Sequence, residues 1–267
     1  MKVFEIGEHT INTKEILERI EYKESDIIFL SGSLIEGIGN SKSDLDVFIL
    51  TDSFNSYRET EYEKKHRKTE FFLINELQCD VEIWDITAIY SILQQLDSIN
   101  LSDTKLRTAN SLNYENINIE SIFSFFHRFI MGQPLINFKG FNDLLNSLNK
   151  DNYFTLLNRW NVNIIDLMYE DIVGNMKKGE YETAYIILNT AMIKSLLSYL
   201  SYKGVSTDRD KWAYINMKNL SIIDPETKTI LEEFQKLFFE REDFQKIEEN
   251  CKKRIKFINK LIRKYKL

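Results

Sequence analysis

The sequence predicts an α+β domain followed by an all-α domain. Two observations favour this fold class. Between residues 27 and 86, short runs of β-branched and aromatic residues alternate with turn or helical segments, as in a sheet. After about residue 115 the β signal fades and apolar residues recur at helical spacing. We therefore expect one domain at residues 1–115 and a second at residues 116–267.

The first domain is expected to contain four strands and a leading helix. The strands are apolar runs bounded by turn residues, and the helix has amphipathic spacing. The expected strands span residues 26–31, 44–50, 68–74 and 79–86, and the helix spans residues 14–22. The highly charged segment 59–67 is expected to be an exposed helix or loop that runs into the third strand.

The second domain is expected to consist of helices. They span residues 119–131, 141–148, 153–177, 181–203, 225–239 and 243–265. Pro225 suits the first turn of its helix, because a backbone N–H has no helical partner there. Gly132 with Pro134 is expected to end the preceding helix, and Gly204 is expected to be a helix C-cap.

Composition and charge exclude several classes of protein. With 43% hydrophobic and 28% charged residues, the chain resembles a soluble globular protein, and it lacks an apolar run of 18 residues. Its N-terminal residues are too acidic for a signal peptide, so we expect a cytoplasmic protein with no membrane partner. Two distant cysteines and three histidines do not suggest a disulfide framework or a zinc site. The net charge of −6 argues against a general nucleic-acid binder.

An Asp-x-Asp pair follows a Gly-Ser turn near the middle of the first domain. Gly32 and Ser33 come directly after an apolar run, and Asp44 and Asp46 open the next one. Residues two apart on a strand project from the same face, so both carboxylates are expected beside the turn. Carboxylate oxygens bind divalent metal ions, and backbone N–H groups in a turn bind phosphate. The segment therefore predicts a metal and phosphate site.

This segment resembles the signature of the DNA polymerase β-like nucleotidyltransferase superfamily, and especially its small-molecule members of the aminoglycoside and lincosamide type. The shared pattern is an apolar strand followed by Gly32-Ser33, Gly39 and the acidic pair Asp44 and Asp46. The resemblance implies a nucleotidyltransferase domain with a mixed β-sheet and flanking helices. It also implies a helical bundle after that domain, which completes the acceptor cleft.

The superfamily pattern also requires a third acid on a neighbouring strand. Residues 79–85 supply candidates. Glu82 best fits the pattern because hydrophobic residues flank it, and Asp80, which shares its face, remains the alternative. Asp85 is expected to face away from both.

The resemblance implies a metal-dependent transfer of an NMP unit from an NTP, with release of pyrophosphate. Asp44, Asp46 and Glu82 would hold two Mg²⁺ ions about 4 Å apart, which would clamp the attacking and departing oxygens. Mg²⁺ prefers carboxylate and phosphate oxygens. Ser33 and the backbone at Gly32 would hold the β- and γ-phosphates of the NTP.

The helical half adds candidates by the same resemblance. Glu170 and Asp171 resemble acids that can act as general base for the acceptor hydroxyl, although a solvated helix face is the simpler interpretation of both. Lys211 could reach the triphosphate as a point charge, or could be an ordinary surface lysine. His127 is expected to be a hydrogen-bonded histidine without a catalytic role, and Arg128 to touch phosphate.

Transfer of AMP to a hydroxyl of a small molecule such as an antibiotic is the leading functional hypothesis, and the acidic chain favours a cationic acceptor. The alternatives are a tRNA or protein acceptor and a non-catalytic nucleotide-binding module. A nucleic-acid partner rests only on the C-terminal helix, which has eight cations and no acid from Lys252 onward. A solvated basic face is the simpler interpretation of that helix. Both a monomer and a homodimer are compatible with the sequence.

Overall fold

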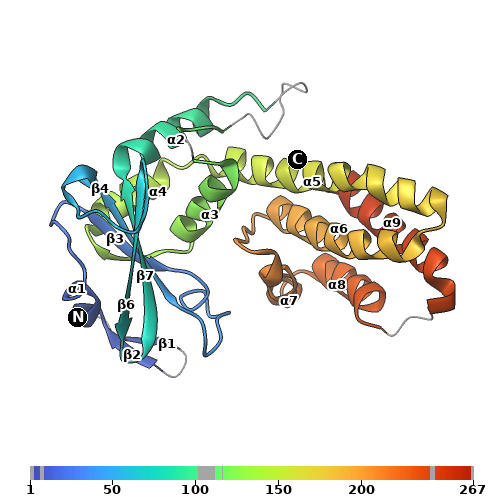
Figure 1. The fold of residues 1–267 in the computed structure, drawn as a ribbon, viewed down its shortest axis with the longest axis horizontal. Helices are drawn as coiled ribbons and strands as arrows, with labels where there is room; N and C mark the ends of the chain where they lie inside the picture. The colour runs from blue at the N-terminus through green and yellow to red at the C-terminus, as the bar shows by residue number, and fades with distance from the viewer. Residues whose placement is uncertain (1–2, 7–8, 102–111, 116, 241–243, 266–267) are drawn as a thin grey trace. The chain divides into compact units, whose positions relative to one another are not determined.

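The computed structural model describes residues 3–6, 9–101, 112–115, 117–240 and 244–265, and the chain divides into two compact units (Figure 1). The first unit comprises Met1–Asn100 and Ser111–Asn149, and the second comprises Leu101–Asn110 and Lys150–Leu267. The first contains a six-stranded sheet with flanking helices, and the second contains helices. The predicted α+β fold class is confirmed.

The sheet of the first unit is mixed and has the strand order β5-β6-β7-β4-β3-β8. β4 and β7 run parallel, and every other neighbouring pair runs antiparallel. The strands are β3 (Ile27–Ser31), β4 (Leu45–Thr51), β5 (Tyr62–Lys64), β6 (Arg67–Ile74), β7 (Leu77–Asp85) and β8 (Gln133–Ile136). A separate two-stranded sheet pairs β1 (Val3–Ile6) with β2 (His9–Asn12).

One face of the large sheet forms an apolar core. Val47 and Ile49 of β4 and Val81 of β7 are buried there, together with Ile16 of α1 (Thr13–Leu17). Because side chains alternate along a strand, the intervening residues of β4 and β7 point to the opposite face.

Aromatic rings cover part of that opposite face. Phe29 of β3 stacks on Phe48 of β4, with 4.9 Å between ring centroids. Two rings of α3 (Ile119–Ile130) pack against this pair: Phe129 on Phe29, and Phe125 on Phe48. This aromatic cluster fixes α3 to the same face of the sheet from which the predicted site residues project.

The first unit extends further along the chain than the predicted boundary after residue 115. Besides α3, it includes β8, which pairs with β3, and α4 (Phe138–Asn146), whose Phe141 joins the aromatic cluster. From the sequence, Pro134 is expected to help end the preceding helix, and no strand is predicted there. In the structure it lies within β8. An edge strand tolerates proline because one side of it needs no N–H donors. The unit boundary therefore lies between residues 149 and 150.

Two other predicted elements differ from the structure. The charged segment 59–67 contains the short strand β5, which pairs with β6, in place of a helix or loop. Its charged side chains are tolerated because an edge strand is exposed to solvent. The leading helix α1 ends at Leu17 and is shorter than the expected span of residues 14–22.

The second unit is helical throughout its assigned elements. It contains α5 (Lys150–Lys178), α6 (Tyr181–Tyr202), α7 (Ala213–Ser221), α8 (Pro225–Phe238) and α9 (Ile247–Lys264). Pro225 begins α8, and Gly204 follows α6 with a φ of +73°, as expected of a C-cap. The helix α7 has no counterpart among the predicted helices. Among the helices that the structure describes, none is long and apolar enough to span a membrane.

Substitution of Phe129 by alanine is expected to destabilise the first unit by about 3–5 kcal/mol, because it leaves a cavity in the aromatic cluster. Phe129 is fully buried and contacts Phe29, Phe125 and Phe141. Urea denaturation measures the loss. Tyr90→Ala, which removes a ring that is 55% exposed, is the matched control. A loss below about 1 kcal/mol for Phe129→Ala would contradict the assigned packing.

Candidate active site

The register of the sheet brings acidic side chains to one face beside the aromatic cluster. Asp46 of β4 lies directly opposite Asp80 of the parallel strand β7, and Glu82 follows two residues later on the same face. Asp44 is the residue directly before β4. The negative charges of Asp44 and Glu82 are close enough to raise the pKa of both Asp46 and Asp80. These four side chains are called the carboxylate cluster below.

The loop after β3 begins in contact with this cluster. Ser31, the last residue of β3, lies opposite Asp46. Gly32 has a φ of +86°, and a Cβ atom at this position would lie 1.8 Å from Asp46 Oδ2, so that a larger residue would force the carboxylate or the loop to move. The loop then closes tightly, because the N–H groups of Ile38 and Gly39 both donate to the Ser33 carbonyl oxygen. Gly32 is therefore in direct contact with the carboxylate cluster, and a phosphate contact by Gly32 and Ser33 stays a prediction.

Arg128 of α3 provides a positive charge at the cluster. Its Nη1 atom lies 2.6 Å from Asp46 Oδ1, and both side chains are largely buried. Ser31 Oγ donates a hydrogen bond to the Arg128 carbonyl oxygen at 2.7 Å, which ties α3 to the end of β3. The sequence suggested a phosphate contact for Arg128 and did not reveal its pairing with Asp46. No local pattern relates a residue of α3 to a residue of β4.

The neighbouring His127 connects α3 to the loop. Its Nε2 atom lies 3.0 Å from Glu36 Oε1, and both side chains are almost fully buried. His127 is thus a hydrogen-bonded interior histidine, which is the role expected from the sequence. Two adjacent residues of α3 therefore hold the Gly32–Gly39 loop and Asp46.

Burial raises the pKa of Asp46 from 3.8 to about 6. The Arg128 guanidinium opposes this shift, and the negative charges of Asp44 and Glu82 add to it. The pKa of Asp80 is also raised, chiefly by burial and further by Asp44 and Glu82. The charged forms of Asp46 and Asp80 are therefore disfavoured in this structure, and a bound cation would stabilise them.

Asp80 and Glu82 are both placed to serve as the third carboxylate. Asp80 is the nearer in register, since it faces Asp46. Glu82 accepts a hydrogen bond from Trp84 Nε1 at 2.9 Å and lies 3.7 Å from Arg67 Nη1. These contacts hold the Glu82 carboxylate in place. Both acids are therefore candidates for the third carboxylate, as the sequence predicts.

Asp85 projects away from the face of the carboxylate cluster and stabilises the start of a helix. Its carboxylate caps α2 (Ile86–Ser98) by accepting the Thr87 backbone N–H at 2.9 Å. It also lies 3.2 Å from His66 Nδ1. These bonds hold the pKa of Asp85 below its usual value.

The carboxylate cluster fits Mg²⁺ by the chemistry of its donors. As the side chains stand, the described residues include no group of three Asp, Glu, His or Cys side chains arranged to hold a metal ion. The cluster nevertheless offers only carboxylate oxygens, which Mg²⁺ prefers. Burial raises the pKa of Asp46 and of Asp80, and neighbouring carboxylates add to both shifts, so a divalent cation would stabilise the charged forms of these two acids. Binding would require Asp46 to share its charge between the ion and Arg128.

The candidates predicted in the helical half belong to the second unit. Glu170 and Asp171 lie on the exposed surface of α5. Lys211 lies in a 3-10 turn before α7, and its Nζ atom sits 4.6 Å from the centre of the Trp212 ring. Their roles as general base and triphosphate ligand stay predictions.

Comparison with known proteins decides the class of this domain. Residues 12–107 match the family model described as a nucleotidyltransferase domain. They form a nucleotidyltransferase domain of the DNA polymerase β-like superfamily. This nucleotidyltransferase domain includes the Gly32 loop and the whole carboxylate cluster. The match assigns to this domain the transfer of an NMP unit from an NTP.

Comparison of the whole chain adds a structural neighbour. A nucleotidyltransferase-like protein from Exiguobacterium sibiricum 255-15 aligns with a TM-score of 0.48 and 11% sequence identity. The alignment covers 91% of this chain and 70% of that one. A search of curated protein sequences finds no match.

Proposed function

We propose that the protein transfers AMP from ATP to a hydroxyl of a small molecule, with two Mg²⁺ ions held by Asp44, Asp46 and either Glu82 or Asp80. The observation that carries this proposal is the carboxylate cluster in direct contact with the loop at Gly32. Carboxylates would hold the metal ions, and the loop would hold the departing phosphates.

The reaction is an in-line displacement at the α-phosphorus of ATP. The acceptor hydroxyl oxygen forms the new bond to phosphorus, the bond to the bridging oxygen breaks, and pyrophosphate leaves. Bound Mg²⁺ would stabilise the charge on the attacking and leaving oxygens. Ser33 and the backbone of the loop would orient the β- and γ-phosphates, while Arg128 keeps Asp46 in position.

Residues of the second unit would complete the chemistry. Glu170 or Asp171 would take the proton from the acceptor hydroxyl, and Lys211 would contact the triphosphate. These assignments rest on the family resemblance of their segments. By the same resemblance, aminoglycoside and lincosamide antibiotics are the first acceptors to test. Because the reaction uses ATP, we place it in the cytoplasm.

A nucleic-acid acceptor receives less support than a small molecule. Cations of the C-terminal helix α9 are paired with acids of the same unit, which reduces their attraction for a polyanion. Arg254 is buried, and its guanidinium lies 4.0 Å from the centre of the Tyr185 ring. The ion pairs are Lys252–Glu248, Lys253–Glu249, Lys260–Glu233 and Lys264–Glu226.

Removal of divalent metal is expected to reduce nucleotidyl transfer at least about 100-fold, because the carboxylates alone cannot neutralise the charge that develops on the phosphates. The protein is incubated with each labelled NTP and a panel of aminoglycosides and lincosamides, in Mg²⁺ or in EDTA. Labelled acceptor and released pyrophosphate are measured. We expect ATP to be the preferred donor and added Mg²⁺ to restore the reaction.

Two results would count against this function. One is transfer that proceeds equally well in EDTA. The other is a protein that neither releases pyrophosphate from any NTP nor binds ATP more tightly when Mg²⁺ is added, as measured by calorimetry.

A further inference from the structure

The reaction geometry defines the side from which the acceptor enters, given the proposed function. The loop at Gly32 follows β3 and would hold the leaving pyrophosphate. Asp80 and Glu82 lie across β4 from that loop, on β7. An in-line displacement places the attacking oxygen opposite the leaving group. The acceptor must therefore approach over β7 and the strands beyond it, β6 and β5.

Two exposed aromatic rings extend the carboxylate face in that direction. Phe71 of β6 lies opposite Asp80, and Thr69 lies opposite both Glu82 and Tyr62. Residues that face each other across neighbouring strands project from the same side of a sheet. Tyr62 and Phe71 are 59% and 51% exposed, and their rings meet edge to face with centroids 5.6 Å apart. They form an open aromatic surface beside the carboxylates.

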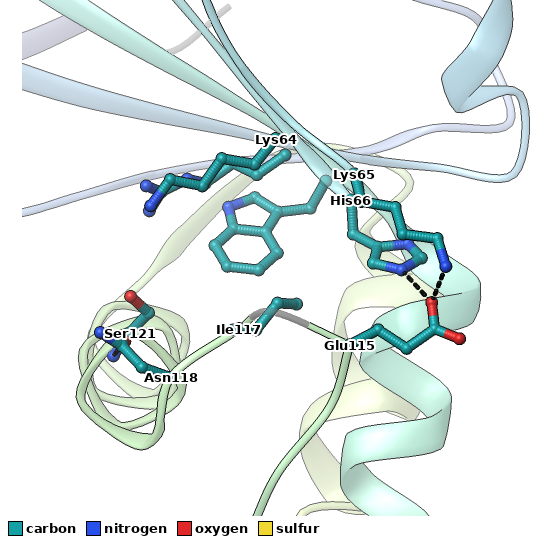
Figure 2. Close-up of a pocket in the computed structure, with 9 residues that line it drawn as sticks. Lys64, Lys65, His66, Glu115, Ile117, Asn118 and Ser121 are labelled. Carbon is teal, nitrogen blue, oxygen red and sulfur yellow. Dashed lines mark hydrogen bonds and ion pairs between the residues drawn. The ribbon is translucent and has the colours of Figure 1, made fainter.

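Basic side chains lie next to these rings. Lys64 is opposite Arg67, and Arg67 is opposite Trp84, so all three share the face of the carboxylate cluster. They line a pocket together with Asn118 and Ser121 from the start of α3 (Figure 2). The Arg67 guanidinium lies 5.5 Å from the centre of the Trp84 ring. The pocket thus combines an aromatic wall with positive charge.

The basic residues of this pocket differ in their partners. Lys65 and His66 turn towards Glu115 and pair with it, whereas Lys64 extends to the other side of the pocket (Figure 2). Among the described residues, Lys64 has no acid within ion-pair distance. In the described part of the chain, Glu82 is the one acid that forms an ion pair with Arg67, at 3.7 Å. Lys64 is therefore available to bind an anion, and Arg67 can bind it with the N–H donors that do not face Glu82.

We infer that the acceptor is a hydroxyl compound with a planar ring and an anionic group, either a carboxylate or a phosphate. Its ring would lie against Tyr62 and Phe71, and its anion would bind Lys64 and Arg67. This inference rests on the proposed function, because the carboxylate cluster defines the reaction centre. It reverses the expectation of a cationic acceptor that the net charge of −6 suggests. The local charge around the acceptor, rather than the charge of the whole chain, determines which acceptor binds.

Probes of equal shape and opposite charge test this inference. We use 4-hydroxyphenylacetate and 4-hydroxyphenyl phosphate as anions and tyramine as their cationic counterpart. Binding is measured by calorimetry with Mg²⁺ and a non-hydrolysable ATP analogue present, so that the NTP site is filled. At least one of the two anions is expected to bind at least about 10-fold more tightly than tyramine. A carboxylate that binds while the phosphate does not, or the reverse, identifies which anion the pocket takes.

Two variants separate the charge from the ring. Lys64→Gln is expected to reduce the preference for the anions about 3- to 10-fold, and Phe71→Ala to weaken all three probes about 10-fold. Lys14→Gln and Tyr90→Ala are matched controls, since both remove exposed side chains elsewhere in the same unit. Equal binding of tyramine and the anions, or no effect of either pocket variant, would overturn the inference.

The same samples distinguish this failure from a failure of the proposed function. Metal-dependent binding of ATP, and its loss in Asp46→Asn, report on the carboxylate cluster without an acceptor. If they are present and tyramine binds as tightly as the two anions, the acceptor assignment is wrong while the proposed reaction stands. If they are absent while the anions still bind through Lys64 and Phe71, the reaction is wrong and the pocket binds an anion for another purpose.

Discussion

Replacement of Asp46 by asparagine is expected to lower the rate of AMP transfer roughly 1,000-fold. Asparagine keeps the size of the side chain but removes a metal-binding charge, at a cost of about 4 kcal/mol in the transition state. The measurement is kcat/KM for ATP with excess Mg²⁺. Asp52→Asn, which changes an exposed acid just after β4, is the matched control and should keep wild-type activity. An Asp46→Asn variant with more than a tenth of wild-type activity would contradict the proposed role.

The same variant is expected to alter the pH dependence of stability in the metal-free protein. The pKa of Asp46 is raised from 3.8 to about 6, so the folded state retains a proton that the unfolded state loses. This contribution to stability is complete below pH 3.8 and is lost as the pH rises through 6. Between pH 5 and pH 7 the loss amounts to about 1 kcal/mol in the free energy of unfolding. Urea denaturation in EDTA at these two pH values should show it in wild type and not in Asp46→Asn.

Alternation along strands made much of the carboxylate face predictable. The spacing of Asp44 and Asp46, and of Asp80 and Glu82, indicates which residues share a face of their own strand. It does not indicate which residue of one strand lies opposite which residue of the next. The parallel register that pairs Asp46 with Asp80 depends on packing across the whole sheet. For this reason the choice of third carboxylate was open from the sequence.

The contacts that α3 makes with the sheet and the Gly32 loop could not be predicted from local sequence patterns. Its helical spacing predicted the helix correctly, but its burial against the sheet depends on rings from β3 and β4. That packing sets Arg128 against Asp46 and His127 against Glu36. Because of this packing, the first unit includes α4 and ends at Asn149 rather than at the predicted residue 115.

The basic pocket was missed for a related reason. Charged residues disfavour strands on average, so the segment around Lys64 suggested a helix or loop. An exposed edge strand accepts such residues because charge there prevents pairing with other chains. Once β5 is paired with β6, the alternation rule alone places Lys64 and Arg67 on the carboxylate face. Knowledge of one additional strand would have been enough to predict this part of the surface.

Substitution of Gly32 by alanine is expected to lower the rate of transfer roughly 1,000-fold and to destabilise the protein more than substitution of Gly37 in the same loop. The new Cβ atom would lie 1.8 Å from Asp46 Oδ2 and 2.8 Å from Asp46 Cγ, so the carboxylate or the loop must move. A positive φ of +86° adds about 1 kcal/mol of backbone cost. The activity loss should match that of Asp46→Asn. One change displaces the Asp46 carboxylate and the other removes its charge, and both would prevent it from binding the metal ion.

Gly37 provides the control for the backbone effect. It has a φ of +72° in the same loop, but an added Cβ would meet no atom within 4 Å. Gly37→Ala should therefore cost about 1 kcal/mol in the free energy of unfolding and keep most of the activity. Urea denaturation and initial rates with ATP compare the two variants. If both lose activity equally, backbone conformation explains the effect of Gly32→Ala. If only Gly32→Ala does, contact with Asp46 is what requires glycine at this position, and the loop and the carboxylate act as one site.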